Sequence, residues 1–312
     1  MKQSLLSHLI CPRCLPAEHR LTLEEGYAAG EDIKTGILIC TRHGCRFPIV
    51  DGVAMLTPQP LADPATVNTY ETEAAVSSYL WGQYGDLLGE EQASTVYADW
   101  AGLIEPQHGM ALDAGAAVGR FTFEMSTRCD LAVGIDTSLA FVRVARHLMH
   151  RGTITFLLKD EGLLHREMTI TLPAHWRRQQ VEFIVADALA LPFPRNWATI
   201  FSSLNLVDKV PSPLTHLQEM NRVARDQNAQ LLFADPFSWS AAMAPVTEWL
   251  GGTPTGPFAG KGIANIARLL QGYQGELTPA WQVAEPDHLW WTLRTHSNHY
   301  ELIRSWYIRA HR

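Results

Sequence analysis

The stretch Ala111-Leu-Asp113-Ala-Gly115-Ala-Ala-Val-Gly119 determines how the rest of the chain is interpreted. An acidic residue is followed by glycines two and six positions later, at the end of an apolar run that begins at Met110. Glycines at this spacing let the backbone turn sharply from a strand into a helix while a ligand lies against it. The stretch therefore predicts a strand, loop and helix with a ligand site at the loop.

The residues that follow alternate between short apolar runs and amphipathic stretches, which is typical of a parallel sheet covered by helices. Strands are expected at 110–114, 131–136, 181–187, 199–204 and 230–235. Helices are expected near 118–128, 138–150, 214–225 and 263–271. A terminal hairpin is predicted for the aromatic-rich segments 289–295 and 301–309. The fold class is therefore α/β, with a doubly wound sheet of the Rossmann-like type.

Two more of the expected strands end in carboxylates. Asp136 closes the second strand, and Asp187 with Ala188 follows the third. The carboxyl ends of parallel strands meet at one edge of a sheet, where open α/β sheets bind ligands. One such Asp is commonly only a helix N-cap, but three in register favour a binding crevice. Asp136 suits the two hydroxyls of a ribose, and the Asp187–Ala188 pair suits the edge of an adenine.

Residues 110 to about 235 resemble the class I S-adenosylmethionine-dependent methyltransferases, and their motifs are those quoted above. The resemblance implies that S-adenosylmethionine is the cofactor. It also implies that the glycine loop contacts the methionyl part, that the second acid binds the ribose and that the third strand end binds adenine. After the fourth strand, Asn205 would contact the cofactor beside its transferable methyl. The implied cofactor-binding residues are Asp113, Gly115, Gly119, Asp136, Asp187, Ala188 and Asn205.

A finer resemblance extends from about residue 78 to 312. The motifs DEGLL at 160–164, NLVDKV, DPFSW and WLGG are similar to those of the 4-mercaptohistidine N1-methyltransferases. This likeness implies methyl transfer to a small-molecule nucleophile, for example an imidazole nitrogen of a thiohistidine-like substrate. Asp208 would be the orienting group or base, and His299, with His296, would contact the substrate. The turn before the fifth strand, at 225–229, departs from that pattern.

Four of the five cysteines lie in the first 45 residues, at Cys11, Cys14, Cys40 and Cys45. A CxxC knuckle followed by a second close pair predicts a structural zinc site with four thiolate ligands. His43 is the alternative fourth ligand, because Cys40 and His43 also have CxxH spacing. A redox-active CxxC or simply buried thiols are the competing interpretations.

The segment from Cys11 to Leu56 resembles the small zinc-ribbon family that activates tRNA and protein methyltransferases as a partner subunit. The resemblance lies in the CPxC start, the later cysteine pair and the FPIVDGVAML tail. It implies either a cover for the chain's own domain or a module that contacts a protein partner. Residues 1–50 carry six basic and five acidic side chains, which is too neutral for a module that binds RNA.

The prolines at 58, 60 and 64 mark a domain boundary. Helical periodicity then runs from about 66 to 104. We therefore expect a zinc-ribbon module at 1–60, a helical linker or cap at 61–108 and a methyltransferase domain at 109–312.

The 312 residues carry a net charge of −7, so the chain lacks the broad cationic surface typical of nucleic-acid binders. An RNA methyltransferase is still an alternative, because one rRNA guanine-N1 family joins a zinc module to this fold. A non-catalytic scaffold is another. No apolar run approaches the roughly 18 residues of a membrane span, and no signal peptide is evident at the start. A soluble, cytoplasmic enzyme is therefore expected.

Overall fold

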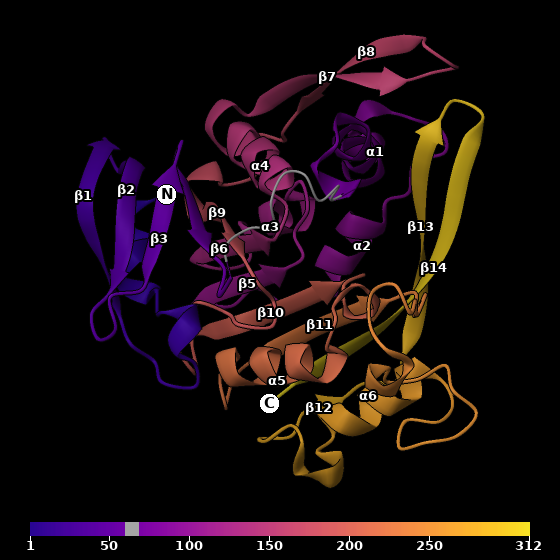
Figure 1. Ribbon diagram of the computed structural model, residues 1–312. Coiled ribbons are helices and arrows are strands. Elements are labelled where there is room, and N and C mark those ends of the chain that lie inside the picture. The colour runs from indigo at the N-terminus through magenta and orange to yellow at the C-terminus, as the bar shows by residue number, and fades with distance from the viewer. Residues whose placement is uncertain (60–68) are drawn as a thin grey trace.

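The protein is represented by a computed structural model that describes residues 1–59 and 69–312 (Figure 1). The expected boundary at Pro60 and Pro64 and the expected helix start at Thr66 lie outside the described residues. One large twisted sheet forms the centre, and helices cover both of its faces.

Five parallel strands form the middle of this sheet in the order β9-β6-β5-β10-β11. Their bounds are Met110–Ala114 for β5, Leu131–Asp136 for β6, Val181–Ala186 for β9, Ala198–Leu204 for β10 and Gln230–Asp235 for β11. All five predicted strands are confirmed. They are almost completely buried because helices pack on both faces, as is usual for parallel strands.

The helices form two layers (Figure 1). One face is covered by α1 (Glu73–Tyr84), α2 (Val96–Gly102), α3 (Arg120–Met125) and α4 (Leu139–Arg151). The other face is covered by α5 (Pro213–Val223) and α6 (Gly262–Leu270). Short 3-10 turns lie at Gln3–His8, Pro12–Cys14, Thr69–Glu71, Gly85–Leu88, Arg178–Gln180, Val207–Lys209, Val246–Glu248 and Tyr273–Gly275. Within the described ranges, every helix is too short or too polar to cross a bilayer.

Two hairpins project from this core at the top and right of Figure 1. The terminal hairpin, predicted from sequence, consists of β13 (Asp287–His296) and β14 (His299–His311), and β14 also pairs with β11 and with the short β12 (Gln282–Val283). A separate hairpin is formed by β7 (Thr153–Lys159) and β8 (His165–Thr171). The two tips touch, because Ser297 donates through its backbone N–H and its hydroxyl to the Asp160 carbonyl, at 3.0 and 2.9 Å.

The N-terminal segment extends the central sheet. Strands β1 (Leu21–Ala29), β2 (Asp32–Cys40), β3 (Arg46–Val50) and β4 (Val53–Leu56) pair in antiparallel succession. Strand β4 then pairs in parallel with β9, with Met55 opposite Val185 and Leu56 opposite Ala186. The segment is therefore joined to the parallel strands by backbone hydrogen bonds.

A network of buried ion pairs also links the N-terminal strands to the parallel strands. Arg146 on α4 forms ion pairs with Glu182 on β9 and, at 2.9 Å, with Asp32 on β2. Arg146 and Glu182 are only 3% and 0% exposed. Burial would raise the pKa of Asp32, but the ammonium groups of Lys34 and the N-terminus, together with Arg146, hold it below its usual range. The network thus links three elements that are distant in sequence.

Candidate functional site

A cavity of about 670 Å³ lies at the carboxyl ends of the parallel strands. The first turn of the α/β unit, helix α1 and the terminal hairpin all contribute to its wall. Cavities of this size bind molecules as large as a nucleotide. Five of the residues predicted from sequence line it together, namely Gly115, Asp136, Asp187, Ala188 and Asn205.

The glycine loop leaves room for a ligand on one side and for helix packing on the other. Gly115 has a φ of +76°, and a Cβ there would lie 3.1 Å from Leu206, another residue of the cavity wall. Gly119 has a φ of +92°, and a Cβ there would lie 2.7 Å from the ring of Phe183. Gly119 is therefore needed for α3 to pack on β9, and it is not part of the cavity wall.

The Asp136 carboxylate is held at the cavity by backbone amides. One oxygen accepts from the N–H of Ala117 and the other from the N–H of Ser138, both at 2.9 Å. Burial raises the pKa of Asp136 to about 6. Because a carboxylate has about four acceptor positions, two remain for hydroxyl groups of a ligand.

Asp113 lies behind the cavity wall and does not line it. It is 3% exposed and accepts from the hydroxyls of Thr122 and Ser202, at 2.7 and 2.9 Å. Burial raises the pKa of Asp113 to about 6. Its contacts connect β5 with α3 and β10, so it supports the glycine loop from below.

Asn205 stands at the tip of β10 with a φ of +57°. Its side-chain oxygen accepts from the hydroxyl of Ser305 at 2.6 Å, and its backbone N–H donates to Ala234 at 2.7 Å. The amide nitrogen Nδ2 is buried and has no hydrogen-bond partner among the described residues. An unpaired buried donor costs about 1–3 kcal/mol, which a ligand acceptor atom would recover.

The structure does not bring Asp208 or His299 into the cavity wall. The Asp208 side chain is fully buried, accepts from the backbone N–H of Ser238 at 2.7 Å and lies 3.1 Å from the Lys209 ammonium. Burial and the neighbouring charge of Asp208 raise the pKa of Asp235 well above its usual value. His299 is exposed at the hairpin turn, 2.6 Å from the Thr295 hydroxyl, and His296 pairs with it there.

Sequence reasoning missed several residues of the cavity wall. Lys209 faces the cavity where Asp208 was expected, and Glu301 joins it from β14. Tyr79 and Trp291 add aromatic surface, with ring centroids 6.2 Å apart. The period of two along β14 is the signal that could have found Glu301, because it shares a face with Ile303 and both line the cavity.

The comparisons with known proteins agree with this architecture. The protein-family model described as "Methyltransferase domain" matches residues 112–229. This segment is a methyltransferase domain. It contains the glycine loop, Asp136 and Asp187, so these residues of the cavity wall lie in the matched part of the chain, whereas α1 and the terminal hairpin lie outside it. The chain is accordingly an enzyme of the methyltransferase class with a Rossmann-like α/β fold.

Solved structures show distant likenesses to the chain. One is from work on the conversion of a disulfide bond into a thioacetal group during echinomycin biosynthesis, with 17% identity, a TM-score of 0.45 and coverage of 70% of this chain and 80% of that one. Another is an S-adenosylmethionine-dependent methyltransferase from Methanosarcina mazei, with 16% identity, a TM-score of 0.42 and coverage of 70% and 96%. A third is the complex between the Haloferax volcanii Trm112 methyltransferase activator and a methyltransferase, with 16% identity, a TM-score of 0.39 and coverage of 68% and 78%. No curated protein sequence matches the chain.

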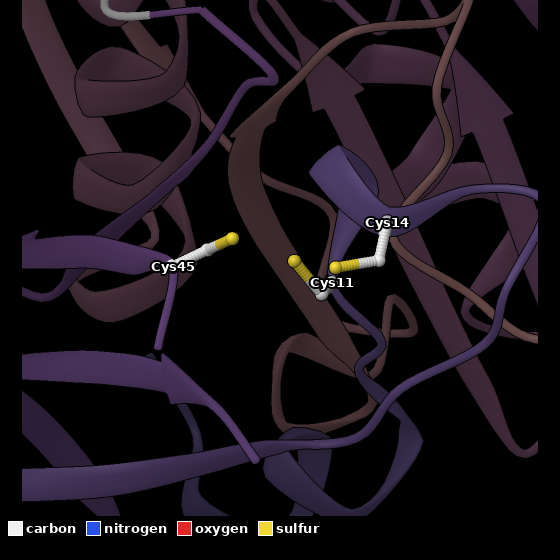
Figure 2. A group of neighbouring side chains, drawn as sticks. All are labelled: Cys11, Cys14 and Cys45. Atoms are coloured by element: carbon white, nitrogen blue, oxygen red, sulfur yellow. The ribbon is translucent and has the colours of Figure 1, made fainter. Parts of the chain in front are cut away.

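A cysteine cluster lies in the segment before the methyltransferase domain. Figure 2 shows Cys11, Cys14 and Cys45 with their sulfur atoms turned toward a common space, and these atoms lie within 4.8 Å of one another. Cys14 belongs also to a second group with Cys40 and His43. The sulfurs of Cys14 and Cys40 are 3.7 Å apart, and the ring nitrogen Nδ1 of His43 is 3.2 Å from the Cys14 sulfur.

Proposed function

We propose that the protein transfers the methyl group of S-adenosylmethionine to a small-molecule nucleophile. The observation that carries this proposal is the Asp136 carboxylate, which backbone amides fix in the same cavity as Gly115 and the Asp187–Ala188 pair. When bound, the cofactor supplies a methyl group already activated on a sulfonium. The protein therefore contributes mainly by positioning and by excluding water.

Different cavity residues would bind different parts of this cofactor. Asp136 would accept from the ribose hydroxyls, and Asp187 with Ala188 would meet the adenine. Gly115, supported by Asp113, would allow the methionyl part to lie against the backbone. Asn205 has its amide donors unpaired beside the same cavity, which supports its assignment as a cofactor contact.

The other half of the cavity supports a small acceptor with charges of both signs. Lys209 provides a cation there, and Glu301 provides a carboxylate without an ion-pair partner among the described residues. Tyr79 and Trp291 offer flat surfaces on which a heteroaromatic ring could stack. A thiohistidine-like amino acid has these features. Its neutral imidazole nitrogen would need little help from a general base, so Asp208 would serve only to hold Lys209 in place.

We also propose that the cysteine cluster holds one structural zinc ion. In a tetrahedral site with Zn–S bonds of about 2.3 Å, two sulfurs lie about 3.8 Å apart. The separation of 3.7 Å between Cys14 and Cys40 fits that geometry. Cys11 and Cys45 would complete the four thiolates, and His43 would contact Cys14 from outside.

The N-terminal module would serve the chain's own methyltransferase domain and not a separate protein. This proposal rests on the pairing of β4 with β9, because β9 ends immediately before Asp187. Binding the ion would order the ribbon and, through this pairing, support the adenine side of the cavity.

The test is calorimetry with S-adenosylhomocysteine, followed by incubation with methyl-labelled S-adenosylmethionine. Label is expected in 4-mercaptohistidine and not in unrelated amines. Transfer of label to RNA would replace the proposal by an RNA methyltransferase. Cofactor binding without transfer to 4-mercaptohistidine, to fractionated metabolites or to RNA would indicate a non-catalytic scaffold, and absence of nucleoside binding would remove the proposal altogether.

A further inference from the structure

His216 on α5 is a buried histidine with both ring nitrogens engaged. It is 0% exposed, with Nδ1 3.3 Å from the carbonyl oxygen of Ala188 and Nε2 2.8 Å from the hydroxyl oxygen of Ser203. A carbonyl can only accept, so Nδ1 carries the proton and Nε2 accepts from the hydroxyl. Burial lowers the pKa of His216 to about 4, which keeps the ring in this neutral form.

The two partners of His216 belong to strands that are not neighbours. Ala188 follows β9 and Ser203 lies on β10, whereas β6 and β5 separate these strands in the sheet. The tips of all four strands contribute to the cavity wall. The imidazole therefore connects the loop after β9, on the proposed adenine side of the cavity, with β10, and Asn205 directly follows that strand.

Most polar groups of the loop after β9 form hydrogen bonds within the protein. The carboxylate of Asp187 accepts from Leu189 N–H at 2.8 Å, and its carbonyl accepts from Ala190 N–H at 3.0 Å. His216 occupies the Ala188 carbonyl. The N–H of Ala188 donates to no described residue, although Ala188 lines the cavity. The Ala188 N–H is thus left to bind a ligand, and the hydrogen bonds around it fix its orientation.

We infer that His216 is a positioning residue for the cofactor: by holding the Ala188 carbonyl, it presents the Ala188 N–H to the adenine. This inference rests on the proposed adenosine site. A structural role alone would change the stability of the protein. The positioning role changes the affinity of the folded protein for any ligand that contains adenosine.

The test is calorimetry with adenosine and with S-adenosylhomocysteine on three variants. His216→Leu keeps the approximate volume but cannot donate, so both affinities should fall about tenfold, as expected for loss of one preorganised hydrogen bond. His216→Asn places an amide donor near the position of Nδ1 and should restore both to within about threefold of the original. Asn221→Leu is the matched control, because it removes another buried polar link of α5, to Thr278 and Trp281, and should leave both affinities unchanged.

Unchanged affinities in folded His216→Leu would overturn the inference. If the original protein binds neither nucleoside, the proposed function fails instead. Should His216→Leu not fold, Ser203→Ala decides, because it releases the ring at its other nitrogen. A weakening of about threefold for both ligands supports the inference, and unchanged binding overturns it.

Discussion

At the scale of single residues, hydrogen bonds from backbone amides orient the carboxylates of the cavity before a ligand binds. Asp136 accepts from the N–H of Ser138, and Asp187 accepts in the same way from the N–H of Leu189, in each case two residues further on. Such Asx contacts fix the side-chain rotamer at the strand tip. A ligand therefore meets oriented acceptors, and little side-chain entropy is lost when it binds.

The raised pKa of Asp136 predicts that affinity for the cofactor depends on pH. With a pKa of about 6, the carboxyl group becomes protonated as the pH falls from 7 to 5 and loses acceptor capacity. The affinity for S-adenosylhomocysteine should therefore fall by up to about tenfold per pH unit below 6. Calorimetry between pH 5 and 8 measures this dependence.

The variant Asp136→Asn separates this effect from that of Asp113, whose pKa is also raised to about 6. An amide has a single acceptor oxygen, so the N–H of Ala117 or of Ser138 loses its partner and affinity at pH 7 should fall at least about tenfold. The remaining pH dependence should be smaller than in the original protein. A flat profile for the original protein would contradict the prediction.

A site residue could be predicted from the sequence when its position depends only on neighbouring residues in the chain. Asp136 and Asp187 end apolar strands, so their place at the edge of the sheet follows from the sequence. The side chain that enters the cavity after β10 depends instead on the turn Val207–Lys209, which buries Asp208 and exposes Lys209 to the cavity. His299 lies instead at the exposed end of the β13–β14 hairpin, outside the cavity wall.

At the scale of elements, the cysteine cluster joins the 3-10 turn Pro12–Cys14 to strands β2 and β3. If it binds zinc, elemental analysis will find one zinc per chain. Cys14→Ser should lose the metal, because its sulfur belongs to both candidate ligand groups. Chelation of the original protein should lower its thermal unfolding temperature, since ligands that bind only the folded state stabilise it.

Cys129→Ser is the control for this experiment. Cys129 is a free cysteine, 6% exposed, in the turn between α3 and β6, and its thiol donates to the Met125 carbonyl at 3.2 Å. Its variant should keep the full zinc content even if its stability changes. A metal-free original protein with an unchanged unfolding temperature would argue against the site.

The strands also differ in how well their positions could be predicted from the sequence. Strands such as β5 and β6 are continuous apolar runs, and their predicted bounds are those observed. Hairpin β7–β8 was not predicted, although β7 alternates between exposed and less exposed residues, with Ile154, Phe156 and Leu158 on the less exposed face. The pairing of β4 with β9 joins residues about 130 positions apart, and a local pattern contains no information on such a contact.

At the scale of the whole molecule, the buried pair Arg146–Glu182 holds the N-terminal strands, β9 and α4 together. Arg146→Met would leave a buried carboxylate without its counter-ion and should lower the free energy of unfolding by about 3–5 kcal/mol. Adding Glu182→Gln should recover part of this loss, because the uncompensated charge is removed. Urea denaturation of both variants measures the difference.

Arg143→Met is the matched control on the same helix. Arg143 is exposed and lies 3.9 Å from Asp51, so its loss should change the free energy of unfolding by less than about 0.5 kcal/mol. Equal effects of the two arginine substitutions would show that the buried network contributes nothing beyond a surface pair.

Strand β4 is joined to the methyltransferase domain through one continuous polypeptide, and this has a consequence for how the enzyme behaves on dilution. A separate subunit leaves its partner once the concentration falls below the dissociation constant. A tethered strand instead competes for its place at an effective concentration set by chain length alone, commonly in the millimolar range. The edge of β9 should therefore stay covered however scarce the protein becomes, and activity per molecule should be the same at nanomolar and micromolar enzyme.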